Sequence, residues 1–186
     1  MQRFHFWNPL FLFVFAILVR LGFAWFTQFD GLYGQDPFAY FNYALSLRAA
    51  LAAGQPPPPF FWPIAYPALI ALAALITGSQ ASAGQLISLL AGAAIAPLVY
   101  WMVREYRPQA SVGAIVAGLL TAVAAQLLLS SLSIMADTSA LFWGALSALC
   151  LVRYVPRLAW KWLVLAAVTL AFAVLTRWGY ALLVFP

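Results

Sequence analysis

The chain has 186 residues, of which 66% are hydrophobic and 7% are charged. A soluble domain contains roughly 25% charged residues, so this chain lacks the charges that would cover a soluble fold of its size. The composition excludes an ordinary cytosolic fold, a disordered chain and a disulfide-stapled secreted domain, and it predicts an all-α polytopic membrane protein. The net charge of +5 does not indicate nucleic-acid binding, because membrane proteins collect Lys and Arg in cytoplasmic loops and no long basic run is present.

Five apolar stretches predict about five transmembrane helices within a single module. About 20 apolar residues are needed to cross the hydrocarbon core of a bilayer. The last stretch reaches a similar length if Lys161 and Arg177 lie at opposite interfaces. The five stretches occupy residues 9–29, 84–103, 110–129, 138–155 and 160–179.

A further apolar stretch, residues 63–77, is short for a crossing and contains two prolines. If the N-terminus is cytoplasmic and this stretch does not cross, only Arg48 and Arg177 lie outside. Lys and Arg then predominate inside, as the positive-inside rule requires. We therefore predict a re-entrant or interfacial segment, in a multi-pass protein of the plasma membrane. The residues placed inside are Arg3, Arg104, Arg107, Arg153, Arg157 and Lys161.

The first outer loop, residues 30–83, is much longer than the other connections, and long ordered loops usually carry function. Pro37 is suited to a helix start and Gly54 to a helix end, which predicts a helix over 37–53. We expect this helix to lie flat on the outer leaflet, with Phe38, Phe41 and Leu45 toward the lipid.

Asp36 directly precedes this helix. Tyr40 and Tyr43 lie within the helix, four and seven residues after Asp36, so the three side chains share one face. A carboxylate at the membrane surface can act as a general base or hold a divalent cation. Asp36 can equally serve as the N-cap of the helix. The spacing alone leaves both interpretations open.

Arg20 lies within the first predicted span, where an arginine costs at least ~2.5–3.5 kcal/mol on insertion. We expect it to point inward and to be paired, although snorkelling to the interface is the alternative. Asp137 begins the fourth span and suits an N-cap. Arg177 ends the fifth span, where it can anchor the chain at the interface or bind a lipid phosphate. No Cys and His spacing typical of a metal site is present.

The order of these features resembles the integral-membrane GT-C-fold glycosyltransferases, the group of the protein O-mannosyltransferases and aminoarabinose transferases. The resemblance covers nearly the whole chain. It is carried by Arg20 in the first span, by Asp36 with Tyr40 and Ala44, and by a proline-rich segment at 62–67. A serine-rich stretch ending at Asp137 and the sequence Leu175-Thr176-Arg177 complete it.

The resemblance implies transfer of a sugar from a polyprenyl-phosphate donor to an acceptor on the outer face, with inversion. It implies that Asp36 is the catalytic base, and that Arg20, Tyr40, Tyr43, Asp137 and Arg177 surround the substrates. The acceptor, whether lipid, glycan or protein, is left open, and a divalent cation is possible. Relatives are longer, so we expect the chain to be the N-terminal part of such an enzyme.

The alternative from a different class is a non-catalytic membrane module, such as a transporter or scaffold subunit. A transporter predicts an internal repeat and broken helices near the midplane. The later spans do not repeat the earlier ones, and the outer acids lie near the membrane surface. We therefore favour the glycosyltransferase.

Overall fold

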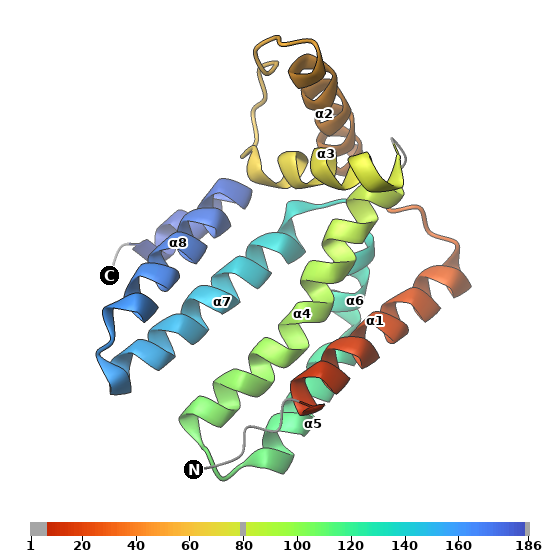
Figure 1. Ribbon diagram of the computed structural model, residues 1–186. Coiled ribbons are helices and arrows are strands. Elements are labelled where there is room, and N and C mark those ends of the chain that lie inside the picture. The colour runs from red at the N-terminus through yellow and green to blue at the C-terminus, as the bar shows by residue number, and fades with distance from the viewer. Residues whose placement is uncertain (1–6, 79–80, 185–186) are drawn as a thin grey trace.

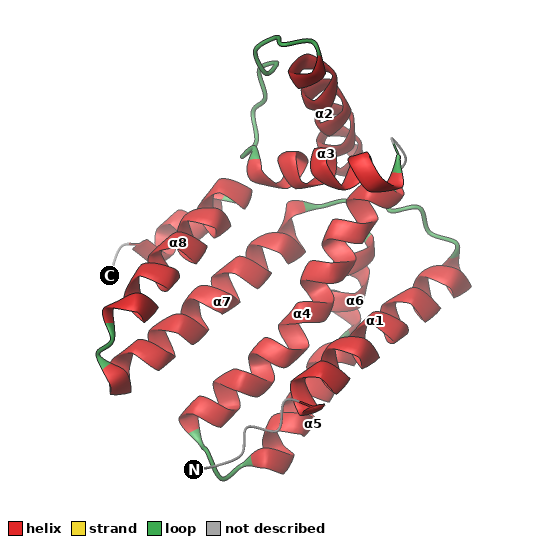
Figure 2. Cartoon of the chain, viewed as in Figure 1, coloured by secondary structure: helices red, strands yellow, loops and turns green. Residues whose placement is uncertain are grey.

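The computed structural model describes residues 7–78 and 81–184, so Arg3 lies outside the described residues. The described part is helical and contains no strand (Figure 2). The elements are α1 (Trp7–Thr27), α2 (Gln35–Ala52), α3 (Ala65–Thr77), α4 (Ser82–Tyr106), α5 (Ser111–Val123), α6 (Ala125–Leu132), α7 (Ala136–Arg157), α8 (Trp160–Thr176) and the 3-10 helix η1 (Trp178–Val184).

Within the described residues, α1, α4 and α7 are long and apolar enough to cross a membrane. Together, α5 and α6 make a fourth span if the pair, bent by 52°, counts as one. Helix α8 has 17 residues, about 25 Å of helix, and is shorter than the roughly 30 Å of hydrocarbon that a spanning helix must cross. The prediction of an all-α polytopic membrane protein is confirmed, but by length and composition the five predicted spans become three or four.

The span predicted over 110–129 corresponds to the bent pair α5 and α6, because the chain leaves the helical conformation at Ala124. The backbone of Ala124 has φ −59° and ψ 117°, which ends α5 and starts α6 in a new direction. The last carbonyls of α5 therefore lose their helical partners. One of them, Ala122 O, accepts a hydrogen bond from the Arg20 guanidinium at 3.2 Å instead. This side chain from α1 compensates for the break.

Helices α1 and α4 run antiparallel, which fixes where the first long loop begins and ends. Asn8, in the first turn of α1, donates to the hydroxyl of Tyr100 near the end of α4, at 3.4 Å. Arg20, in the second half of α1, donates to Gly92 O in the first half of α4. The end of α1 and the start of α4 therefore lie at the same end of the bundle, and the re-entrant or interfacial position of residues 63–77 stays a prediction.

Helices α2 and α3 form a hairpin on this end of the bundle, with α3 lying across it and α2 packed on α3 (Figure 1). The predicted helix over 37–53 corresponds to α2, and Gly54, which follows the C-cap residue Ala53, has φ +65°. Gln55 N donates to Ala50 O at 2.8 Å and Gly54 N donates to Leu51 O at 3.2 Å. These two bonds satisfy the last carbonyls of α2. The orientation of α2 on the outer leaflet stays a prediction.

The opposite end of the bundle carries most of the basic residues. There Arg153 and Arg157 on α7 donate to the two carboxylate oxygens of Glu105 on α4, at 2.8 and 2.9 Å. The Arg153 guanidinium also lies over the rings of Trp101 and Trp162, so it joins α4, α7 and α8. The charged residues at this end are therefore tied together by side-chain contacts between helices, and the sidedness of the bundle in a membrane stays a prediction.

Candidate functional site

A cavity of about 310 Å³ opens at the end of the bundle that carries the α2–α3 hairpin. We call it the end cavity. It is built from four separate parts of the chain: the start of α2, the segment before α3, the loop before α7 and the segment after α8. Its lining residues are Asp36, Tyr40, Trp62, Pro63, Met135, Arg177, Trp178 and Gly179. Two predicted site residues with opposite charges, Asp36 and Arg177, therefore line the same cavity.

Asp36 lies in the first turn of α2 with an exposed side chain. The N-cap of α2 is Gly34, with φ +79°, and no side chain caps the helix by a hydrogen bond. The interpretation of Asp36 as the N-cap is therefore not supported. Its carboxylate has access to water and to the cavity, which a general base needs.

Tyr40 lies one turn further along α2 and is buried, with 6% of its surface exposed. Its ring packs edge-on against Tyr66 and Phe60, with centroid distances of 5.4 and 5.9 Å. Burial raises the pKa of the Tyr40 phenol above its ordinary value, while the nearby Arg177 lowers it and Asp36 raises it. At neutral pH the phenol is therefore a neutral hydrogen-bonding group between the carboxylate and the guanidinium.

Arg177 caps the end of α8 and forms an ion pair with Asp137 in the first turn of α7. The predicted N-cap role of Asp137 is wrong, since the N-cap of α7 is Met135 and no side chain caps the helix. Half of the Arg177 side chain is exposed. The pair brings Asp137 beside the end cavity without making it a lining residue.

Two other predicted site residues serve the packing of the helices. The Tyr43 hydroxyl donates to Pro58 O at 3.0 Å, and its ring stacks on Phe60 at 3.9 Å. These two contacts hold residues 58–60, in the loop between α2 and α3, against α2. Arg20 is fully buried and donates to Ala16 O, Ala122 O and Gly92 O at 3.0–3.2 Å. It points inward, as predicted, but its partners are carbonyls of α1, α4 and α5, and it does not line the end cavity.

The sequence analysis missed Gln85, which joins the two loops leading to the site. Its amide nitrogen donates to Phe29 O at 2.7 Å and to Leu132 O at 3.3 Å. Ile134 N also donates to Gly31 O at 3.0 Å. A Cβ on Gly31 would lie 2.7 Å from Gln85 Cγ, so this position requires glycine for its space as well as for its φ of +87°. The signal available in the sequence was that Gln85, a polar amide, lies near the start of the apolar span predicted over 84–103.

Among the described residues, no group of three or more His, Cys, Asp or Glu side chains comes together in a way that could hold a metal ion. The divalent cation therefore stays a prediction with no ligand set assigned to it.

A helical membrane protein with a carboxylate and a guanidinium facing one cavity at the end of its bundle fits the class of membrane-embedded transferases. A family model described as dolichyl-phosphate-mannose-protein mannosyltransferase matches residues 70–186, more than half of the chain. The chain belongs to this family and is a glycosyltransferase of the mannosyltransferase kind. The resemblance to that group is confirmed. No curated protein matches the chain, and no solved structure matches it either.

The matched segment includes Asp137 and Arg177 but begins after Asp36, Tyr40 and Tyr43. The roles of these three residues therefore depend on the geometry of the end cavity and on the sequence resemblance.

Proposed function

We propose that the chain transfers mannose from a polyprenyl-phosphate donor to a hydroxyl acceptor, with Asp36 as the base. The observation that carries the proposal is the shared position of Asp36 and Arg177 on the end cavity. The family description names a lipid-phosphate-linked mannose donor, which gives an anionic phosphate for Arg177 and a sugar for the cavity.

In the proposed reaction, the acceptor oxygen attacks the anomeric carbon from the side opposite the phosphate. The Asp36 carboxylate takes the proton of the acceptor hydroxyl as the new C–O bond forms. The bond between the anomeric carbon and the phosphate oxygen breaks, and polyprenyl phosphate leaves with the electron pair. The configuration at the anomeric carbon is therefore inverted.

Arg177 is proposed to bind the phosphate of the donor. A guanidinium presents several N–H donors in a plane and suits phosphate oxygens well. It would stabilise the negative charge that grows on the leaving phosphate. The neutral Tyr40 phenol, beside both charged groups, is proposed to hydrogen-bond the sugar.

The position of the cavity suits a lipid-linked donor. A polyprenyl chain stays in the bilayer while its phosphate and sugar lie at headgroup level. The end cavity lies at the end of the bundle, as such a donor requires. We propose that this end faces outward, since the basic residues at the other end are expected inside.

The test is the Asp36→Asn variant in membranes containing the full chain, supplied with radiolabelled polyprenyl-phosphate mannose. Transfer of label out of the donor lipid should fall at least about 100-fold, because general-base catalysis typically contributes that much. Asp30→Asn is the matched control: Asp30 is at the same end, but its carboxylate accepts a hydrogen bond from Leu32 N at 3.0 Å and does not line the cavity. Equal activity in both variants and the wild type would reject Asp36 as the base.

A further inference from the structure

Two tryptophans line the end cavity and have no part in the reaction proposed above. Trp62 lies in the segment before α3, and Trp178 is the first residue of η1. They are 37% and 52% exposed, so a ligand in the cavity can reach both indole rings. Large apolar rings that stay accessible inside a hollow beside charged groups suggest a ligand with an apolar surface of its own.

The two indole rings are held in place by one aromatic neighbour. The ring of Phe61 lies edge-on against Trp62, with a centroid distance of 4.9 Å and an interplanar angle of 79°. It also lies edge-on against Trp178, at 5.5 Å and 69°. Edge-to-face pairs of this kind are favourable. Phe61 therefore joins the segment before α3 to the segment after α8, and both indole rings are positioned before a ligand arrives.

Tryptophans in membrane proteins often anchor the chain at the membrane interface. An anchoring tryptophan lies on the outer surface of the bundle. Trp25 near the end of α1 and Trp160 at the start of α8 fit this description, since they are 77% and 75% exposed and do not line the end cavity. Trp62 and Trp178 differ from them, because they line a hollow built from four parts of the chain.

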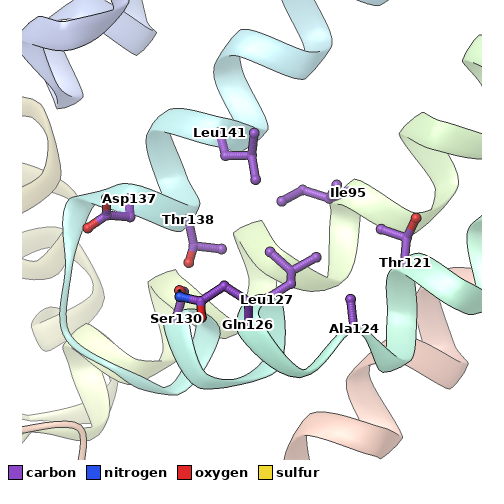
Figure 3. Close-up of a pocket in the computed structure, with 9 residues that line it drawn as sticks. All are labelled: Ile95, Thr121, Ala124, Gln126, Leu127, Ser130, Asp137, Thr138 and Leu141. Carbon is purple, nitrogen blue, oxygen red and sulfur yellow. The ribbon is translucent and has the colours of Figure 1, made fainter.

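An aromatic lining is not shared by every hollow of the bundle. Figure 3 shows a second one, between α4, the α5–α6 bend and α7, with the same volume of about 310 Å³. None of its nine lining residues is aromatic. The end cavity therefore differs from a hollow of equal volume by its aromatic side chains, and it also holds the carboxylate and the guanidinium of the proposed reaction.

A sugar ring has the surface that this combination suits. Its hydroxyl groups project around the edge of the ring, while C–H groups cover part of each face and can pack on a flat indole. Ligand sites typically pair apolar and aromatic walls with a few polar groups that orient the ligand. A phosphate has no C–H face and suits the guanidinium of Arg177 instead. Arg177 and Trp178 are neighbours in the chain, as phosphate and sugar are in the donor.

Resting on the proposed function, we infer that Trp62 and Trp178 bind the mannose ring of the donor by packing their indole rings against its C–H faces. Arg177 holds the phosphate beside them. The anomeric carbon, which joins the sugar to the phosphate, then lies in the part of the cavity that Asp36 also lines. The two tryptophans orient the sugar and take no part in bond making or proton transfer.

The test compares two ligands that differ only in the sugar. Equilibrium binding of undecaprenyl phosphate mannose and of undecaprenyl phosphate is measured with the purified full chain in nanodiscs. The ratio of the two dissociation constants isolates the contribution of the mannose. Trp62→Leu and Trp178→Leu remove the flat ring but keep an apolar side chain, and Trp62→Phe and Trp178→Phe keep a ring. Trp160→Leu is the matched control outside the cavity.

The wild type should bind the ligand that carries mannose more tightly. Each leucine variant should reduce this preference about three- to tenfold, the usual contribution of an aromatic contact. Binding of undecaprenyl phosphate should stay unchanged in these variants, which also shows that they are folded. The phenylalanine variants should keep most of the preference, and Trp160→Leu should bind both ligands like the wild type.

An unchanged preference in both leucine variants would overturn the sugar assignment and leave the proposed donor and base in place. Equal weakening of both ligands would also overturn it, because the indole rings would then support the cavity or the phosphate. A wild-type protein that binds neither ligand would overturn the proposed donor class as well, so the two failures are distinguishable.

Discussion

Arg177 at the end of α8 donates to the carboxylate of Asp137 in the first turn of α7, and this ion pair lies at the edge of the end cavity. The two residues come from different helices but occupy the same end of the bundle. The pair neutralises Arg177 while no phosphate is bound. A donor phosphate would compete with Asp137 for the guanidinium.

This relationship predicts unequal effects for the two partners. Arg177→Gln should lower kcat/KM for sugar transfer about tenfold to a hundredfold, the expected loss of charged hydrogen bonds to phosphate. Asp137→Asn should have a much smaller effect on kcat/KM. Because the Arg177 and Asp137 side chains are both partly exposed, Asp137→Asn should change the free energy of unfolding by less than about 1 kcal/mol. Initial rates and thermal unfolding in detergent measure both quantities. Equal loss of activity in the two variants would mean that Arg177 acts only as the partner of Asp137.

A second prediction concerns Gln85, which joins the two loops that lead to α2 and α7. Gln85→Glu keeps the size of the side chain but replaces the donor to Phe29 O and Leu132 O with a carboxylate. We expect kcat to fall and the amide of Ile134, which donates to Gly31 O, to exchange its hydrogen faster.

Hydrogen exchange followed by mass spectrometry measures the effect on this amide. Gln109→Glu is the control for the added charge, because Gln109 is exposed in the turn between α4 and α5. Unchanged exchange at Ile134 in Gln85→Glu would show that the loops are held together without Gln85.

The sequence was sufficient to predict most of the long helices and three residues that line the end cavity, Asp36, Tyr40 and Arg177. Apolar length located α1, α4 and α7, and turn chemistry located α2, because Gly54 has the positive φ that a helix end favours. The charge of Asp36 and Arg177 was enough to select them as candidates, since charged residues are so rare in this chain.

The bend at Ala124 and the role of Gln85 could not be predicted, for a physical reason. No proline or glycine marks the break in residues 121–126. The hydrogen bond that replaces a lost helical one at Ala122 O comes from Arg20, about a hundred residues away in sequence. Gln85 likewise acts through carbonyls of two distant loops. Local patterns carry no information about such long-range partners.

The third prediction follows from the contacts of Arg20. Arg20→Met keeps an unbranched, flexible side chain, although a shorter one, and leaves the carbonyls of Gly92 and Ala122 without their donor. The free energy of unfolding should fall by about 2–4 kcal/mol, the range for losing buried hydrogen bonds from a charged group. Arg107→Met, at an exposed position after α4, should have little effect. Equal unfolding profiles for both variants in detergent would show that Arg20 does not stabilise the bundle.

The fourth prediction compares two helical glycines, Gly92 in α4 and Gly113 in α5. A Cβ on Gly92 would lie 2.8 Å from Ser131 Cβ and 2.9 Å from Thr138 Cγ2, so Gly92→Ala must push α6 and α7 outward. Such overpacking typically costs about 1–3 kcal/mol, and it should also loosen the Arg20 bond to Gly92 O. The nearest atom to a Cβ on Gly113 is Ala110 Cβ at 3.8 Å, so Gly113→Ala meets only an ordinary contact.

Gly113→Ala should therefore raise stability by up to about 1 kcal/mol, the difference in helix propensity between the two residue types. Thermal unfolding of both variants in the same detergent gives the comparison. A Gly92→Ala variant as stable as the wild type would mean that α6 and α7 can move away from α4 at no cost, and their close approach at Gly92 would then not stabilise the bundle.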